Sequence, residues 1–238
     1  MGSRKMRILV MAGLALVAML SAMGWSIWDG RTARAMPLPE CPDQPPIVID
    51  PGHGGVDGGT NVPGLLEKDV VLDVAQRTKQ YLERYKIPVV LTREADTGLG
   101  GTFDGGHLRR DLNYRLQVAN HCRGALMLSL HVNHTKSTTQ RGMIVFYQPT
   151  RAGRDAAYAF DDILRRWPLH GRKEGPLVRK DFAVLKTKAP AILVEMGFIS
   201  NSEDRELLAD PAYREKVAQA LSSGCAAIYQ KWMKHGAP

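Results

Sequence analysis

The sequence has few cysteines, few aromatic side chains, no low-complexity tract and no internal repeat. Of its 238 residues 3 are cysteine and 7% are aromatic, whereas 44% are hydrophobic and 24% are charged. This ordinary balance excludes a mostly disordered, collagen-like or polytopic membrane chain and favours one globular domain with appendages. Cys41, Cys122 and Cys225 are odd in number and far apart, so we expect neither a disulfide framework nor a cysteine metal cluster. Cys225 shares a helical face with apolar residues, which predicts a packed thiol.

Basic residues exceed acidic ones by 32 to 24, which gives a formal net charge of +8. Residues 1–35 hold five of the basic side chains and one acidic one, so the rest of the chain carries only +4. That part has no basic stripe with interleaved aromatic residues. We therefore expect no nucleic-acid partner.

The N-terminus has the layout of an export signal. A basic cluster from Arg4 to Arg7 precedes an apolar run from Ile8 to Trp28, as in the n-region and h-region of a signal peptide. Ala33-Arg34-Ala35 offers a cleavage site, but the run of 21 residues is also long enough to span a bilayer. Both fates stay open, a cleaved signal peptide or a retained membrane anchor, and either predicts an exported, extracytoplasmic protein.

Beyond a proline-rich stem, short apolar strands alternate with amphipathic helices. Strands are expected at 47–49, 89–91, 125–130, 143–147, 191–194 and near 182–185, and helices at 70–85 with Asp69 as N-cap, 108–121, 154–167 and 211–232. Alternation with apolar strands that are buried on both faces predicts a single α/β domain. We expect a twisted, mostly parallel sheet of about six strands flanked by helices. The chain then divides into a leader (1–35), a stem (36–45) and a catalytic domain (46–235).

Polar residues follow three of the expected strands. His53 lies in a glycine-rich segment after the first strand, His131 follows the third, and Glu195 follows the last. Glu67 ends the loop that leads into the first helix. Because ligands collect at the carboxyl ends of parallel strands, we expect these residues to lie together. Two histidines and a carboxylate suit Zn²⁺ with one position open for water, and Glu195 would lie beside them.

Each of these residues also has a simpler structural interpretation. His53 between glycines fits a turn, and Glu67 fits a solvated charge at a helix N-terminus. The spacing matches no short zinc signature such as HExxH. Glu195 resists such an interpretation, because a carboxylate at the end of a buried strand needs a partner or a task.

Five segments occur together in a characteristic order: IVIDPGHGGVDGG (47–59), LLEKDVVLDVA (65–75), VVLTRE with Asp96 (89–96), LSLHVN (128–133) and AILVEMGFISNSED (191–204). Jointly they resemble the zinc-dependent N-acetylmuramoyl-L-alanine amidases of the amidase-3 type. The resemblance implies that His53, Glu67 and His131 bind zinc and that Glu195 is the catalytic carboxylate. It also implies a peptidoglycan substrate, cut between the lactyl group of N-acetylmuramic acid and L-alanine.

One subgroup is more similar than the rest. TREADTGL, the glycine-rich loop 98–106, and Arg109-Arg110-Asp111-Leu112 with Arg115 are similar to the germination-specific amidases of spore formers. Those enzymes act in spore cortex, where cleavage prepares muramic-δ-lactam, so the similarity implies action in the intermembrane space of the forespore. The loop itself lacks the Gly-Lys-Ser/Thr of a phosphate loop, and a flexible connector is the alternative for it.

Further residues are candidates for supporting roles. Asp50, Ser129 and Asn133 are candidates to orient the imidazoles, with ordinary hydrogen bonding as the alternative. Arg93 and Arg179 are candidates to contact substrate carboxylates, with surface solvation as the alternative. His134 has no assigned role.

Two further functions stay open. One is another zinc amide hydrolase of the cell wall, a peptidase or deacylase, and the other is a non-catalytic wall-binding protein. Competent residues at all four catalytic positions argue against the second. Because the segment between residues 147 and 182 has room for only one helix and no wall-binding repeat ends the chain, we expect a constitutively open site. We also expect a monomer. Its targeting would depend on the leader or on an accessory protein.

Overall fold

The computed structural model describes residues 36–101, 103–167 and 175–235. The expected leader at residues 1–35 therefore lies outside the described residues. Within them, no helix combines the length and hydrophobicity needed to span a bilayer.

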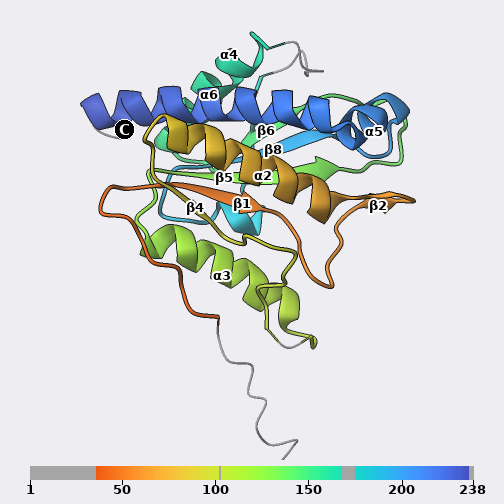
Figure 1. The fold of residues 1–238 in the computed structure, drawn as a ribbon, viewed down its shortest axis with the longest axis horizontal. Coiled ribbons are helices and arrows are strands. Elements are labelled where there is room, and N and C mark those ends of the chain that lie inside the picture. The colour runs from red at the N-terminus through yellow and green to blue at the C-terminus, as the bar shows by residue number, and fades with distance from the viewer. Residues whose placement is uncertain (1–35, 102, 168–174, 236–238) are drawn as a thin grey trace, which may run out of the picture. The chain divides into compact units, whose positions relative to one another are not determined.

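A six-stranded sheet forms the centre of the domain (Figure 1). In spatial order its strands are β4 (Val89–Leu91), β1 (Ile47–Pro51), β5 (Leu126–Asn133), β8 (Ala191–Phe198), β6 (Ile144–Tyr147) and β7 (Leu177–Val178). Four of the five neighbouring pairs are parallel, and only β6 and β8 are antiparallel. The prediction of a mostly parallel α/β sheet of about six strands is confirmed.

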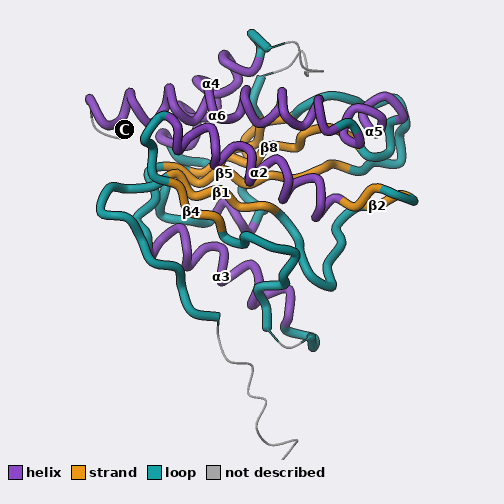
Figure 2. Tube along the Cα trace, viewed as in Figure 1, coloured by secondary structure: helices purple, strands orange, loops and turns teal. Residues whose placement is uncertain are grey.

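Helices cover both faces of this sheet (Figure 2). One layer consists of α2 (Glu67–Arg84), α4 (Arg151–Leu164), α5 (Ser202–Ala209) and α6 (Pro211–His235), and the other contains α3 (His107–His121). The 3-10 helix η1 (Ala183–Leu185) packs into the same hydrophobic cluster as α3. A short hairpin, β2 (Asn61–Val62) and β3 (Leu65–Leu66), precedes α2.

Burial on both sides explains why the strands read as unbroken apolar runs. Ile47 and Ile49 pack into the core under α2 and α6, whereas Val48, which points the other way, packs into the core under α3. In α2 the residues at helical spacing, from Val70 and Val74 to Leu82, face the sheet.

The element boundaries differ from the expected ones at the functional edge. Strands β5 and β8 continue to Asn133 and Phe198, so His131 and Glu195 lie inside strands rather than after them. Helix α2 begins at Glu67, so Asp69 is not its N-cap. The strand expected near 182–185 is wrong, because those residues include η1 and the edge strand β7 lies at Leu177–Val178. A run as short as Phe-Ala-Val-Leu carries too little periodicity to separate the two.

Cys41 and Cys122 form a disulfide, which corrects the expectation drawn from cysteine number and spacing. Their Cα atoms are 5.1 Å apart across a sequence separation of 81. The bond joins the stem to the residue that follows α3, and Tyr114 Oη of α3 also donates a hydrogen bond to Pro37 O. Such pairing depends on which loops the fold brings together, and spacing alone does not reveal it. Cys225 is a buried free thiol, as predicted, and burial raises its pKa.

The disulfide closes a long loop, and its loss should lower stability. We expect the double variant Cys41→Ser/Cys122→Ser to lose about 2–4 kcal/mol of unfolding free energy, measured by denaturant titration without reductant, because the unfolded chain gains entropy. Reductant should destabilise the wild type similarly and leave the double variant unchanged. A fully reduced wild type with unaltered stability would contradict this role.

Candidate metal centre

Two buried arginines hold the turn that carries His53 by donating hydrogen bonds to its backbone carbonyl oxygens. His53 has a φ of 59°, in the left-handed region that non-glycine residues rarely adopt. Arg115 donates to His53 O at 2.7 Å and to Pro51 O at 2.7 Å. Arg93 donates to Gly52 O at 2.9 Å and to Pro51 O at 3.0 Å. These bonds fix an unfavourable backbone conformation and so set the direction of the His53 ring.

Neither arginine that the sequence offered as a substrate ligand stands free. Arg93 is 3% exposed, and backbone carbonyl oxygens accept its hydrogen bonds. Burial lowers the pKa of Arg93 to about 10, and the nearby Arg115 charge lowers it as well. Arg179 pairs with Asp181 at 2.6 Å and lies over the Phe182 ring at 4.3 Å. Arg93 is thus a structural clamp, and Arg179 is bound to a carboxylate of the same segment.

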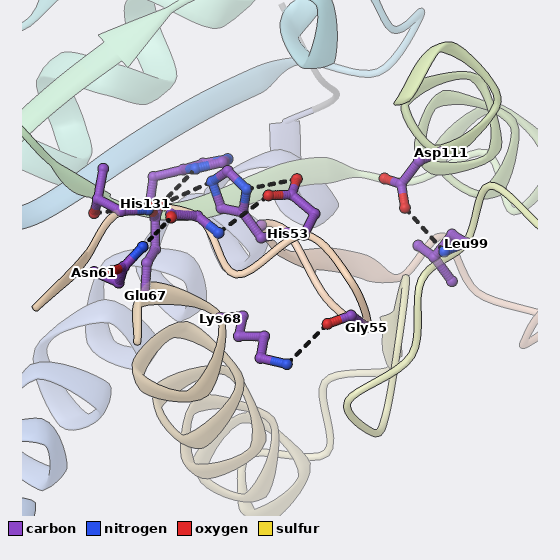
Figure 3. Close-up of polar contacts among 12 residues, drawn as sticks. His53, Gly55, Asn61, Glu67, Lys68, Leu99, Asp111 and His131 are labelled. Atoms are coloured by element: carbon purple, nitrogen blue, oxygen red, sulfur yellow. Dashed lines mark hydrogen bonds and ion pairs between the residues drawn. The ribbon is translucent and has the colours of Figure 1, made fainter. Parts of the chain in front are cut away.

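Three predicted ligands meet at the C-terminal edge of the sheet (Figure 3). One donor atom each from His53, Glu67 and His131 lies within 4.8 Å of the other two. Glu67 Oε1 is 3.2 Å from His53 Nε2 and 3.0 Å from His131 Nδ1. The site therefore contains three groups from β5, α2 and the turn after β1 that can hold a metal ion.

Glu67 is not the solvated charge of the simpler interpretation. It is 2% exposed, its Oε1 accepts a hydrogen bond from Val132 N at 2.9 Å, and its Oε2 accepts one from Thr60 N at 2.8 Å. Burial raises the pKa of this carboxyl, but hydrogen bonds from His131 and His53 outweigh burial and hold the pKa well below its ordinary value. Glu67 is thus kept as a buried anion aimed at the two rings.

Asp57, which the sequence analysis missed, orients the His53 ring. Its Oδ2 is 2.8 Å from His53 Nδ1, so His53 turns Nε2 toward Glu67. Burial lowers the pKa of His53, and the hydrogen bonds and charges of Glu67 and Asp57 raise it to about 9 overall. A metal ion must displace that proton to bind. The sequence offered a sign of this contact, because Asp57 follows His53 by only four residues within the segment IVIDPGHGGVDGG.

Two of the three residues proposed from sequence to orient the imidazoles, Asp50 and Ser129, bond to each other at 2.8 Å rather than to a histidine ring. Asp50 is fully buried and accepts hydrogen bonds from Thr92, Ser129 and Arg115 at 2.6–2.8 Å. Burial by itself would raise the pKa of Asp50, but the Arg115 charge and these hydrogen bonds hold it below its usual range. Asn133 O accepts from Ile199 N at 2.8 Å. His134 is exposed and is not among the clustered donors.

Glu195 lies directly beside this cluster. It pairs with His131 across β5 and β8, and its Oε2 is buried without a hydrogen-bond partner among the described residues. Burial raises the pKa of Glu195, and together with the smaller opposing effect of the histidines this places it at about 7. A carboxyl group with such a pKa exchanges protons readily near neutral pH.

The loop 98–106 begins as a packed element rather than a free connector. A Cβ on Gly55 would lie 2.5 Å from Gly98 N, so the two glycines let the loop and the His53 turn approach closely. Asp96 reinforces this contact, because its carboxylate accepts from Gly55 N at 2.7 Å and pairs with Lys68 at 2.7 Å. Lys68 also donates to Gly55 O at 2.8 Å (Figure 3).

A cavity of about 430 Å³ lies beside His53, His131 and Glu195, and residues of α3 and of the segment 181–184 line it as well. Its volume is in the range of small-ligand sites. His53, His131 and Glu195 line one part of it, and Leu112, Phe182 and Val184 line another. These three candidate site residues therefore face a preformed cleft.

A family model described as N-acetylmuramoyl-L-alanine amidase, of the amidase-3 family, matches residues 47–227. The chain belongs to this family. The amidase therefore hydrolyses the amide between N-acetylmuramic acid and L-alanine in peptidoglycan, and it acts outside the cytoplasm.

Curated relatives include the germination-specific N-acetylmuramoyl-L-alanine amidase of Bacillus subtilis, 36% identical over 182 residues, which are 75% of this chain and 77% of that protein. The N-acetylmuramoyl-L-alanine amidase LytC of the same organism is 32% identical over 77% of this chain, and the match spans 35% of LytC.

Solved structures share the fold. The CwlD amidase from Clostridioides difficile, solved in complex with the GerS lipoprotein, matches with a TM-score of 0.74 and 26% identity over 79% of this chain and all of that one. AmiC2 of Nostoc punctiforme matches with a TM-score of 0.66 and 29% identity, over 78% of this chain and 97% of that one.

Close packing of His131 on Gly52 yields a prediction for metal affinity. A Cβ on Gly52 would lie 2.3 Å from His131 Cε1, so Gly52→Ala must displace the ring. We expect zinc affinity, measured by competition with a chromophoric chelator, to fall roughly 10- to 100-fold, as when a supporting contact of a ligand is lost. Gly58→Ala is the matched control, since a Cβ there meets nothing within 4 Å. Equal affinities in the two folded variants would contradict the assignment of His131.

Proposed function

We propose that the amidase is a zinc enzyme in which His53, Glu67 and His131 bind the metal and Glu195 transfers the proton. The observation that carries the proposal is the convergence of three donor atoms within 4.8 Å beside a buried carboxylate oxygen that has no hydrogen-bond partner among the described residues.

The residues fit a zinc ion. Two imidazole nitrogens and one carboxylate oxygen form a donor set of catalytic zinc sites, which leave one position open. The carboxylate of Asp57 holds the other nitrogen of His53, as carboxylates commonly do for zinc-bound histidines. When bound, zinc supplies Lewis acidity, which lowers the pKa of water and polarises a carbonyl group.

Glu195 has the position of a general base and acid. Its buried Oε2 accepts a proton from the attacking water and then donates it to the alanine nitrogen as the C–N bond breaks. The second transfer is needed because an amine anion is a very poor leaving group. The products are a lactyl carboxylate on muramic acid and a free amino group on L-alanine.

We also propose that residues 1–35 export the enzyme as a signal peptide or anchor, with 36–45 as stem and 46–235 as catalytic domain. The basic cluster and apolar run of the leader support export. The Cys41–Cys122 disulfide supports it independently, because disulfides persist in oxidising compartments.

The substrate that we propose is spore cortex peptidoglycan, cut in preparation for muramic-δ-lactam. Support comes from the 36% identity to a germination-specific amidase. An accessory protein belongs to the proposal as well, because the similar CwlD amidase was solved with the GerS lipoprotein.

Replacing Glu195 should separate metal binding from turnover. We expect Glu195→Gln to bind zinc as the wild type does but to lose several orders of magnitude in kcat on digested sacculi, because the amide cannot take up the proton. Mass spectrometry should show new N-terminal L-alanine and intact lactyl-muramic acid from the wild type only. Glu206→Gln, on an exposed face of α5, is the control and should stay active. Full activity of the Glu195 variant would contradict its role, and new D-amino-acid termini would contradict the cleavage site.

The cortex assignment predicts a chemical phenotype. Spores of a strain without this gene should lack muramic-δ-lactam, measured by chromatography and mass spectrometry of digested cortex, while the vegetative wall is unchanged. Wild-type protein should restore the lactam and the Glu195→Gln protein should not. Normal lactam in the deletion strain would overturn the cortex role and leave the amidase activity untouched.

A further inference from the structure

The cavity beside Glu195 is also lined by a second residue of the same strand, β8. On β8, Leu193 precedes Glu195 by two residues and therefore points to the same face. Its register partner on β5 is Ser129, just as His131 is the partner of Glu195. Leu193 lines the cavity and is 4% exposed. An aliphatic floor thus adjoins the carboxylate that handles the proton.

The walls around Leu193 are apolar and held in place. Leu112 of α3 lines one side, and Phe182, Ala183 and Val184 line the other. The Phe182 ring packs edge-on against Phe146, with centroids 5.2 Å apart, and lies under the Arg179 guanidinium. These contacts fix the side of the cavity that faces α3.

The acidic residues in this part of the cavity are already paired. Asp50 and Asp111 both bind Arg115, at 2.7 and 2.5 Å, and Asp181 binds Arg179. What remains for a ligand next to Glu195 is a small hydrophobic surface, so a polar or charged substituent would be desolvated there without compensation.

We propose that this surface, formed by Leu193, Ala183, Val184 and Leu112, binds the methyl side chain of the L-alanine whose nitrogen leaves. The inference rests on the proposed function, in which Glu195 protonates that nitrogen. A proton donor lies about 3 Å from the atom it protonates, and the alanine methyl is only two bonds beyond the nitrogen. With the carbonyl group facing His53, Glu67 and His131, the methyl group reaches the floor beside Leu193.

The surface therefore selects the first residue of the stem peptide. A methyl group bound in an apolar pocket is worth roughly 10-fold in kcat/KM, so the wild type should prefer N-acetylmuramoyl-L-alanyl-D-glutamate over its glycyl analogue by about that factor. Of the four residues that form this surface, Ala183 has the smallest side chain. A larger residue at position 183 should therefore occupy the space of the substrate methyl group.

The test measures kcat/KM of the zinc-loaded enzyme on the alanyl and glycyl substrates. Ala183→Leu should remove most of the roughly 10-fold preference by slowing the alanyl substrate more than the glycyl one. Leu112→Ser, at a site that is 36% exposed and therefore compatible with folding, should also lower the ratio by weakening the contact with the methyl group. Val178→Leu is the control. Val178 lies exposed on the edge strand β7, outside the cavity lining, so this variant should keep the wild-type ratio.

The outcomes separate the two levels of the proposal. A ratio that falls in Ala183→Leu and Leu112→Ser but not in Val178→Leu supports the methyl site. Turnover of both substrates with an unchanged ratio in both cavity variants overturns it and leaves the zinc amidase intact. No turnover of either substrate by the zinc-loaded wild type overturns the proposed function and this inference with it.

Discussion

The candidate metal centre depends on one buried guanidinium group, that of Arg115. It is 2% exposed and donates to the carboxylates of Asp50 and Asp111 and to the carbonyl oxygens of Pro51 and His53. The two carboxylates outweigh burial and raise the pKa of Arg115, so the group stays charged. Breaking such a buried pair leaves an uncompensated charge, which costs about 3–5 kcal/mol. The left-handed turn at His53 is therefore tied to an ion pair that is costly to break.

Helix α3, which carries Arg115, connects the His53 turn to the rest of the molecule. Arg115 and Leu112 lie on one side of α3, where Arg115 holds the His53 turn and Leu112 lines the cleft. The far end of α3 leads into Cys122, which the disulfide attaches to the stem. A helix that is held at its centre by Arg115 and beyond its C-terminus by the disulfide keeps the cleft wall and the His53 turn in a constant relation, as a preorganised site requires.

Much of this architecture was readable from the sequence, because buried parallel strands and amphipathic helices leave strong patterns. The apolar runs of β1 and β8 and the helical spacing of Val71, Val74 and Leu82 predicted the fold class and the sheet edge where ligands meet. The patterns failed where the local sequence signal is weak or where the outcome depends on residues that are distant in the sequence. Segment 183–185 is too short for its period to be recognised, and His131 and Glu195 look like strand-end residues because they are polar, although both strands continue beyond them.

The sequence by itself determined the chemical groups available, two histidines and two glutamates in segments that resemble one enzyme family. Only the tertiary structure decided how they are used. It joined Asp57 to His53, surrounded Arg93 with backbone carbonyls, and paired Cys41 with Cys122 across 81 residues. The physical reason is distance: hydrogen bonds and disulfides act over a few ångströms, and which groups come that close depends on how the whole chain packs.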